Sequence, residues 1–215
     1  MHNIKVQLKD NPYDIFINQN IDDYINDTIE NLKEYDKVFI LTQQPILDFY
    51  KHHSIFSKYT IIILNESESS KEMTAIERVI DELLIKGCTR SSLLVGFGGG
   101  VTTDTTGFVA SIFMRGIDHV FIPTSLIGMV DASLGGKTGI NSSVARNIIG
   151  TFKQPKAVFI DTLLLKTLPK EEIINGFAEI IKYGLICDAN LFNHLLSSFD
   201  EFLKMEDMNA LELLI

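Results

Sequence analysis

Residues 92–104, SLLVGFGGGVTTD, form the stretch of the sequence best suited to hold a phosphate group. The apolar run LLV leads into a cluster of glycines, and a segment able to form a helix begins near Val101. Glycines let a backbone come within hydrogen-bonding distance of an anion, and a helix start supplies free N–H donors and a partial positive charge. The G-x-G-x-x-G registers that start at Gly96 and Gly98 both lack their last glycine, so the common dinucleotide fingerprint is absent. A phosphate site and a plain tight turn both fit this stretch taken alone.

A second group of residues able to do chemistry lies within 124–151. The letters GGKT at 135–138 look like the end of a P-loop, but that motif needs a glycine at the position that Asp131 occupies. This excludes a P-loop nucleoside-triphosphatase. Charged residues in such a loop-rich segment are most often solvated, whereas the glycines around Lys137 favour close approach of the backbone to a bound group. The polar side chains that remain as candidates are Asp131, Lys137, Arg146 and Asn147.

Glu179 and Lys182 form a third candidate pair. They lie three residues apart in a segment with a helical pattern, so they share one face. A surface ion pair is the plain interpretation, because such pairs are common and weak. The neighbours are apolar, however, and Gly176 and Gly184 thin the helix where something can approach. A carboxylate in that setting can bind a metal, and a lysine can bind a phosphate or a carboxylate.

Apolar strands alternating with amphipathic helices predict an α/β fold, with a Rossmann-like parallel sheet covered on both faces. From Pro169 onward only helical patterns follow, which predicts an α/β domain over 1–164 and the start of an α-helical domain over 165–215. Strands are predicted at 4–8 and 13–17, which form a hairpin, at 37–42, 60–64, 119–123 and 157–161, and at the apolar run 93–95 that leads into the glycines. Helices are predicted at 20–35, from about Pro45, at 71–87 and from about Val101.

Composition narrows the class of protein. The chain has 215 residues, of which 46% are hydrophobic, so it can bury a proper core. The net charge of −9 argues against a nucleic acid or an anionic membrane as the main partner. No run of 18 apolar residues occurs, and Cys88 and Cys187 lie far apart without metal-type spacing, which predicts free thiols. We therefore expect a cytoplasmic soluble protein.

Taken together, the motifs resemble those of one family. GGGV-x-x-D, F-x-RG, PTS-L-x-x-x-VD-A-S-x-GGK-T-G-I-N, RN-I-IG and GFAEIIKYG occur in that order. Over roughly residues 37–195 the sequence resembles 3-dehydroquinate synthase, of the sugar-phosphate cyclase group. The resemblance implies conversion of 3-deoxy-D-arabino-heptulosonate 7-phosphate to 3-dehydroquinate and phosphate, a step of the shikimate pathway. It also implies tightly held NAD⁺, a divalent metal (zinc or cobalt) and a homodimer at full length.

The implied chemistry is redox-neutral. Bound NAD⁺ oxidises one hydroxyl to a ketone, which acidifies the neighbouring carbon so that phosphate can leave; the hydride then returns, and an aldol step closes the carbocycle. By resemblance, the metal ligand is Glu179. The residues implied for the substrate are Arg115, Asp131, Lys137, Asn147 and Lys182. The residues implied for the cofactor are Glu68, Lys71, Gly99, Gly100, Asp104, Thr124, Ser125, Lys137, Arg146 and Thr167.

Several positions depart from the family pattern. Gln43 stands where an aspartate that can grip a ribose is frequent, and Arg146 replaces a lysine with a bulkier, forked group. Ser67 and Thr103 each replace a glycine, and Met129 stands where glutamine is frequent. These changes suggest a divergent member of the family.

Length is the largest departure. Family members are considerably longer, and the two histidines that complete their metal site have no counterpart here. We therefore expect an amino-terminal part that is inactive alone, with the apolar ending ALELLI left uncovered. Three other assignments stay open: another sugar-phosphate cyclase, a metal-dependent alcohol or glycerol dehydrogenase, and a non-catalytic NAD-binding module. Asn147 favours dehydroquinate synthase among the cyclases.

Overall fold

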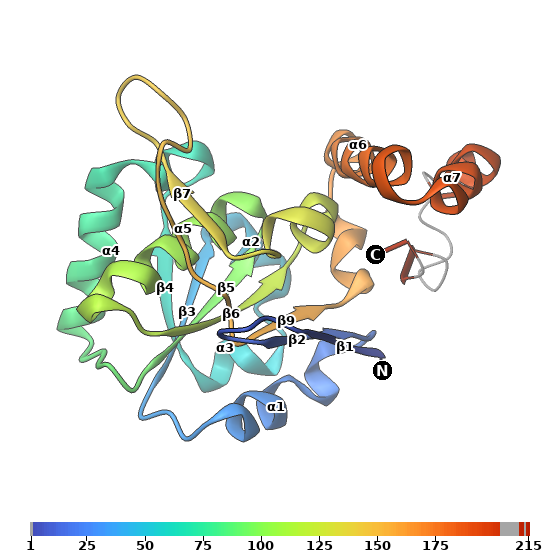
Figure 1. The fold of residues 1–215 in the computed structure, drawn as a ribbon. Helices are drawn as coiled ribbons and strands as arrows, with labels where there is room; N and C mark the ends of the chain where they lie inside the picture. The colour runs from blue at the N-terminus through green and yellow to red at the C-terminus, as the bar shows by residue number, and fades with distance from the viewer. Residues whose placement is uncertain (1, 203–210, 213) are drawn as a thin grey trace.

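The fold is built on one mixed, mostly parallel sheet (Figure 1). A computed structural model describes residues 2–202, 211–212 and 214–215. All strand pairs in this sheet are parallel except the pair at one edge, β1 with β2, which is antiparallel. In order across the sheet, the strands found in the described residues are β1 (His2–Val6), β2 (Tyr13–Ile17), β9 (Ala157–Ile160), β6 (Asp118–Pro123), β5 (Leu93–Gly98), β3 (Val38–Gln43) and β4 (Thr60–Leu64).

Helices cover both faces of the sheet and bury a separate apolar core on each. One core contains side chains from α1, α3, α6 and α7, and the other contains side chains from α4 and α5. α6 and α7 pack on each other at one end of the molecule (Figure 1). The helices are α1 (Ile25–Leu32), α2 (Gln44–Tyr50), α3 (Ser54–Lys58), α4 (Met73–Ile85), α5 (Gly100–Ile112), α6 (Lys170–Cys187) and α7 (Ala189–Phe202), with short helical turns η1 (Ile21–Asp23), η2 (Ser67–Lys71), η3 (Phe113–Arg115), η4 (Gly128–Ala132) and η5 (Thr162–Thr167).

The predicted α/β class is confirmed, and most predicted elements lie within a few residues of their positions in the structure. β5 is buried along its whole length, as expected of a central parallel strand with helices on both faces. The predicted hairpin near the start of the chain is the β1–β2 pair, and β1 is the exposed edge strand. The proposed division into domains 1–164 and 165–215 stays a prediction.

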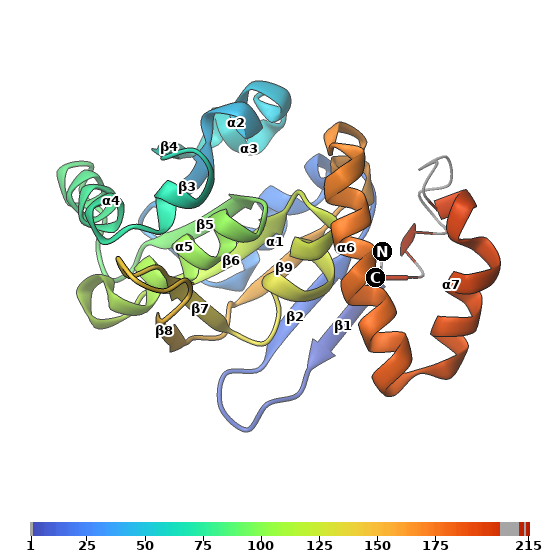
Figure 2. The same cartoon turned by 90° about the horizontal axis from the view of Figure 1, so that it is seen from above.

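The segment 124–151, predicted to be rich in loops, contains short regular structure. η4 is a single turn of π-helix, and β7 (Lys137–Ile140) pairs antiparallel with β8 (Ile149–Phe152). This small two-stranded sheet lies beside α5, apart from the main sheet (Figure 2). Each strand has only four residues, which is too short for a periodic pattern to reveal.

Of the apolar ending ALELLI, Ala210 and Leu213 lie outside the described residues. Leu211 and Leu214 are buried in the core, which contradicts an apolar ending left open to water. Exposed apolar side chains of the helical part lie elsewhere, at Leu185, Ile186 and Leu196. In the part of the chain that is described, no helix combines the length and the apolar character needed to cross a membrane.

Candidate functional site

The glycine turn between β5 and α5 leaves room for a bound group. Gly99 precedes α5, and no side chain caps the first N–H groups of that helix. Gly99 has a φ of −76°, so its backbone does not require glycine. A Cβ atom added at Gly99 would meet Ser125 Oγ at 3.4 Å, and one added at Gly100 would meet Ala132 Cβ at 3.5 Å, both ordinary contacts. Neither backbone strain nor packing explains these two glycines, and the free N–H groups at the start of a helix are able to bind an anion.

Beside this turn, a buried lysine joins three segments. Lys71, in η2, is 3% exposed, and its Nζ donates to Asp104 Oδ2 at 2.7 Å and to Asn147 Oδ1. Burial raises the pKa of the Asp104 carboxyl, and the Lys71 ammonium opposes that rise. The resemblance assigned Lys71 and Asp104 to the cofactor and Asn147 to the substrate. The structure brings all three side chains into one cluster.

Glu68 and Arg146 line a cavity next to that cluster. Neighbouring residues of η2 and the loop 141–148 also line this cavity, whose volume is about 760 Å³. Glu68 Oε2 accepts a hydrogen bond from Asn141 Nδ2 at 3.0 Å, while Arg146 is exposed. At the end of β3, Gln43 Nε2 donates to the carbonyl oxygen of Asn65 at 2.8 Å. This departure from the family pattern therefore ties β3 to the segment that carries Glu68.

The remaining residues implied for the cofactor flank the turn. Thr124 and Ser125 follow β6 and are buried; the Thr124 N–H donates to the Gly98 carbonyl oxygen at 3.0 Å. Thr167 is exposed at the end of η5. The hydroxyl of Tyr50 contacts Thr167 Oγ1 and donates to the carbonyl oxygen of Leu164 at 2.5 Å. Nothing in the sequence pattern had singled out Tyr50.

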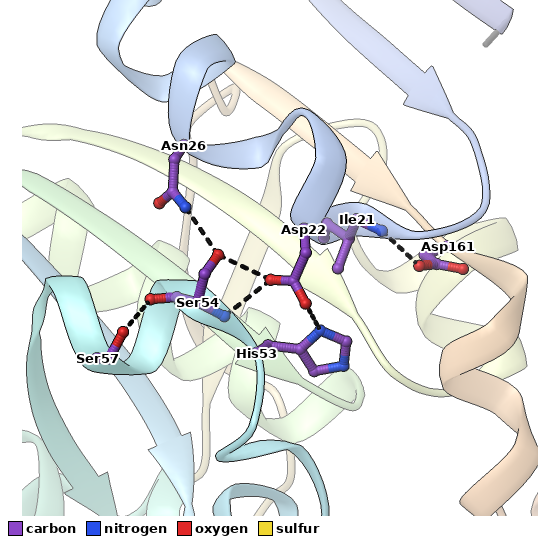
Figure 3. Close-up of polar contacts among 7 residues, drawn as sticks. All are labelled: Ile21, Asp22, Asn26, His53, Ser54, Ser57 and Asp161. Atoms are coloured by element: carbon purple, nitrogen blue, oxygen red, sulfur yellow. Dashed lines mark hydrogen bonds and ion pairs between the residues drawn. The ribbon is translucent and has the colours of Figure 1, made fainter.

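The start of η5 is fixed by a polar network (Figure 3). Asp161 caps η5 through the Leu163 N–H at 2.9 Å and accepts the Ile21 N–H at 2.8 Å, which joins η1 to η5. Nearby, Asp22 accepts hydrogen bonds from the backbone and hydroxyl of Ser54, each at 2.8 Å, and contacts His53 Nδ1 at 2.7 Å. Burial alone would raise the pKa of Asp22, but the bonds from Ser54 and His53 outweigh it and lower that pKa. The network fixes η1 against η5 and α3.

A cleft of about 820 Å³ contains most of the residues implied for the substrate. Asp131 Oδ1 accepts a hydrogen bond from Tyr183 Oη at 2.6 Å across this cleft. Burial and this hydrogen bond raise the pKa of Tyr183 to about 12, so the phenol stays protonated at neutral pH. Tyr183 was visible only as a letter of the GFAEIIKYG motif. The polar side chains that line the cleft include Asp104, Asp131, Lys137, Asn147 and Tyr183.

On α6, Glu179 and Lys182 form the ion pair that their spacing indicated. The hydrogen bond from Lys182 to Glu179 raises the pKa of the lysine, whose ammonium also lies 4.6 Å from the centre of the Tyr183 ring. The close approach expected at the glycines of this helix is present. A Cβ atom at Gly176 would meet the Leu126 side chain at 2.5 Å, so the protein's own chain fills that space.

The metal role predicted for Glu179 and the substrate role predicted for Arg115 are not supported by contacts among the described residues. No group of three or more His, Cys, Asp or Glu side chains suited to a metal ion is found among the described residues. Arg115 is exposed in η3, beyond the far end of α5. α5 separates it from Gly100 by about 20 Å of helix at 1.5 Å per residue. The roles of Glu179 and Arg115 stay predictions.

Comparison with known proteins gives the family. The family model described as 3-dehydroquinate synthase N-terminal matches residues 61–175. A 3-dehydroquinate synthase of Dictyoglomus thermophilum is 44% identical over 196 residues, which cover 91% of this chain and 54% of the relative. The chain thus spans about half the length of the curated relatives it matches.

Solved structures of sugar-phosphate cyclases share the fold. A 2-epi-5-epi-valiolone synthase from Streptomyces hygroscopicus, solved with NAD⁺ and Zn²⁺ bound, has a TM-score of 0.84 and 29% identity, covering 97% of this chain and 60% of that one. A 2-deoxy-scyllo-inosose synthase, solved with carbaglucose-6-phosphate, NAD⁺ and Co²⁺, has a TM-score of 0.76 and 22% identity, covering 86% and 52%. This chain belongs to the 3-dehydroquinate synthase family.

Proposed function

We propose that this chain supplies the NAD-binding part, and one wall of the substrate site, of a 3-dehydroquinate synthase. The observation that carries the proposal is the cluster of Lys71, Asp104 and Asn147 beside the uncapped start of α5. It joins residues implied for the cofactor to a residue implied for the substrate. The reaction would convert the heptulosonate phosphate to 3-dehydroquinate and phosphate without net redox change.

The cofactor side has residues that fit a dinucleotide. The N–H groups at the start of α5, with the space over Gly99 and Gly100, would hold the pyrophosphate. Glu68 and Lys71 would hold polar groups farther along the cofactor. When bound, NAD⁺ would supply the transient oxidation of one substrate hydroxyl. The other residues proposed to contact the cofactor are Asp104, Thr124, Ser125, Lys137, Arg146 and Thr167.

The substrate side presents charges of both signs to one cleft. The ammonium of Lys137 would bind an anionic group of the sugar phosphate. Asp131 would accept a hydrogen bond from a substrate hydroxyl, and the bond from Tyr183 sets the direction of its carboxylate. Asn147 would donate from its amide nitrogen, since its amide oxygen accepts from Lys71. Lys182, on α6, would be a second cation for the substrate.

The remaining parts of the proposal rest on the family alone or on single observations. Glu179 would be one metal ligand, but its carboxylate accepts a hydrogen bond from Lys182 here, and we derive no step through a metal. Arg115 would contact the substrate, and the full-length protein would form a homodimer. A cytoplasmic location is supported by the free thiols of Cys88 and Cys187.

Binding of NAD⁺ to the chain, with Gly99→Ala as the variant, tests the cofactor site. Calorimetry should show a dissociation constant between micromolar and millimolar, roughly −8 to −4 kcal/mol. Gly99→Ala should fold normally, because its Cβ atom makes only ordinary contacts with Ser125, yet bind NAD⁺ more weakly, because that atom fills the space left for the cofactor. Thermal unfolding is the control for folding. Unchanged binding in this variant would contradict the proposed site.

The reaction is tested on the longest natural polypeptide that contains this chain. Given the heptulosonate phosphate, it should release phosphate in step with dehydroquinate while the NADH absorbance stays flat. Steady accumulation of NADH would identify a dehydrogenase instead. The 215-residue chain alone should be inactive and retain no stoichiometric zinc after dialysis, because catalytic zinc sites normally draw three protein ligands.

A further inference from the structure

Asn141, the first residue after β7, makes three hydrogen bonds to residues of the site. Its main-chain N–H donates to the carbonyl oxygen of Lys71 at 2.8 Å. Its side-chain Nδ2 donates to Glu68 Oε2 at 3.0 Å, and its Oδ1 accepts the main-chain N–H of Asn147 at 2.9 Å. A carboxylate only accepts and a main-chain N–H only donates, so these partners fix the orientation of the amide.

The bond to Asn147 holds a left-handed backbone. Asn147 has a φ of +53°, a conformation that asparagine adopts more readily than most residues other than glycine but that still needs local hydrogen bonds to fix it. Asn141 holds the main chain of Asn147, and Lys71 holds its side chain. With both bonds in place, the Asn147 Oδ1 is held against the Lys71 ammonium.

The bonds from Asn141 to Glu68 and Lys71 hold η2. η2 is a turn of five residues, and Glu68 is exposed, so little else orders its carboxylate. If the Glu68 side chain were ordered only on binding, that ordering would reduce the affinity for the cofactor. The Asn141 amide orders this carboxylate in advance and removes part of that cost.

We propose that Asn141 is a positioning residue that ties the cofactor segment, η2, to the substrate-side loop 141–148. The inference rests on the proposed function for the roles of Glu68 and Asn147. It assigns Asn141 no contact with cofactor or substrate. Its side chain sets where the groups that make those contacts stand.

Two variants distinguish the bond that Asn141 Nδ2 donates to Glu68 from the bond that its Oδ1 accepts from Asn147. Asn141→Ala removes both side-chain bonds, so it should raise the Kd for NAD⁺ about tenfold and speed hydrogen exchange at the Asn147 N–H. Asn141→Asp keeps an acceptor for Asn147 but places a second carboxylate against Glu68. It should therefore raise the Kd for NAD⁺ by at least as much while the Asn147 N–H stays protected. Calorimetry and amide exchange by NMR, both on the 215-residue chain, provide the readouts.

Asn175→Asp is the matched control, because Asn175 is exposed on α6 and its Nδ2 also approaches a carboxylate, Glu172 Oε2, at 3.5 Å. It should change neither readout. Equal Kd and equal exchange in Asn141→Ala and the wild type would overturn the proposal, as would loss of Asn147 protection in Asn141→Asp with an unchanged Kd. A wild-type chain that does not bind millimolar NAD⁺ would overturn the proposed function instead. Asn147 exchange in Asn141→Ala would then still decide whether Asn141 holds the loop.

Discussion

Lys71 shows how one buried charge can organise a site. Its side chain is 4% exposed, so its ammonium depends on Asp104 and Asn147 instead of water. Removing one partner of such a pair leaves the other charge buried without compensation, which costs more than the pair itself contributes. The cluster is therefore both a binding feature and a point of vulnerability for the fold.

Lys71→Met should destabilise the chain by about 3 kcal/mol at pH 7, the usual scale for breaking a buried pair. Methionine is similar in length to lysine but leaves Asp104 without its ammonium partner. Urea unfolding of the variant and the wild type measures the difference. Lys71→Met combined with Asp104→Asn removes both charges and should recover most of the loss, whereas equal losses in the single and double variants would contradict the explanation.

The loss should also depend on pH. The pKa of Asp104 is already raised by burial in the folded state, so the folded form binds a proton more readily than the unfolded form. Any stability from this carboxyl is therefore present at low pH and lost as pH rises through its folded pKa. Without Lys71 that pKa rises further, so the deficit of Lys71→Met should be largest at neutral pH and shrink toward pH 4.

At this scale the sequence indicated which residues belong to the site but not which of them touch. Lys71, Asp104 and Asn147 were all named in advance from motifs. Their contact was not, because it joins residues up to 76 positions apart and depends on how η2, α5 and the β7–β8 loop pack. Tyr183 and Asn141 were missed as individuals, since a tyrosine or an asparagine within a motif has no distinctive spacing of its own.

Among the elements, α6 brings Tyr183 to Asp131 because α6 packs closely at Gly176 against the segment before η4. Gly176 lies against the Leu126 side chain and the Ile127 main chain, which directly precede η4. η4 carries Asp131, so the separation of α6 from η4 sets whether Tyr183 reaches it. Buried contacts of this kind cannot absorb an added methyl group without movement.

Gly176→Ala should cost about 1–3 kcal/mol and move α6 away from η4, although alanine favours the helix itself. The loss of the bond to Asp131 should lower the pKa of Tyr183, because that bond is one of the causes of its raised value. Urea unfolding and absorbance titration of the phenolate measure the two effects. Asn175→Ala, at the exposed position just before, is the control and should change neither. A fully stable Gly176→Ala would show that α6 can shift without cost.

Element by element, the long periodic segments were predictable and the short ones were not. β4 matches its predicted range, 60–64, because TIIIL is a continuous apolar run. β7, β8 and η4 carry no periodic signal and exist through contacts with α5, which are distant in sequence. The sequence pattern also suggested that something approaches Gly176 and Gly184. The glycines do mark close approach, but a pattern cannot say that the approaching chain is the protein's own.

At the scale of the whole molecule, the buried side chain of His119 in the central sheet makes stability depend on pH. His119, in β6, is fully buried, with its ring 4.8 Å from that of Phe121. Neither of its ring nitrogens has a hydrogen-bond partner among the described residues. Burial, together with the nearby Lys153 and Lys156, lowers the pKa of His119 from 6.5 to about 3. The imidazole is therefore neutral in the folded state above about pH 3, whereas in the unfolded chain it gains a proton below about pH 6.5.

The wild type should thus lose stability as the solution becomes acidic. Between the two pKa values the unfolded state binds more protons than the folded state, so this stability is present above pH 6.5 and is lost as pH falls toward 3. From pH 7 to pH 5 the loss from this one group is about 2 kcal/mol. Urea unfolding at pH 7, 6 and 5 measures the effect. Between pH 7 and pH 5 the free energy of unfolding of His119→Leu should fall by about 2 kcal/mol less than that of the wild type. At pH 7 the variant should be no less stable, since leucine removes two unsatisfied polar atoms. His2→Gln, at an exposed position, should follow the wild type. Parallel curves for His119→Leu and the wild type would show that the buried ring finds a proton or a partner in the folded state, and that acid sensitivity arises elsewhere in the molecule.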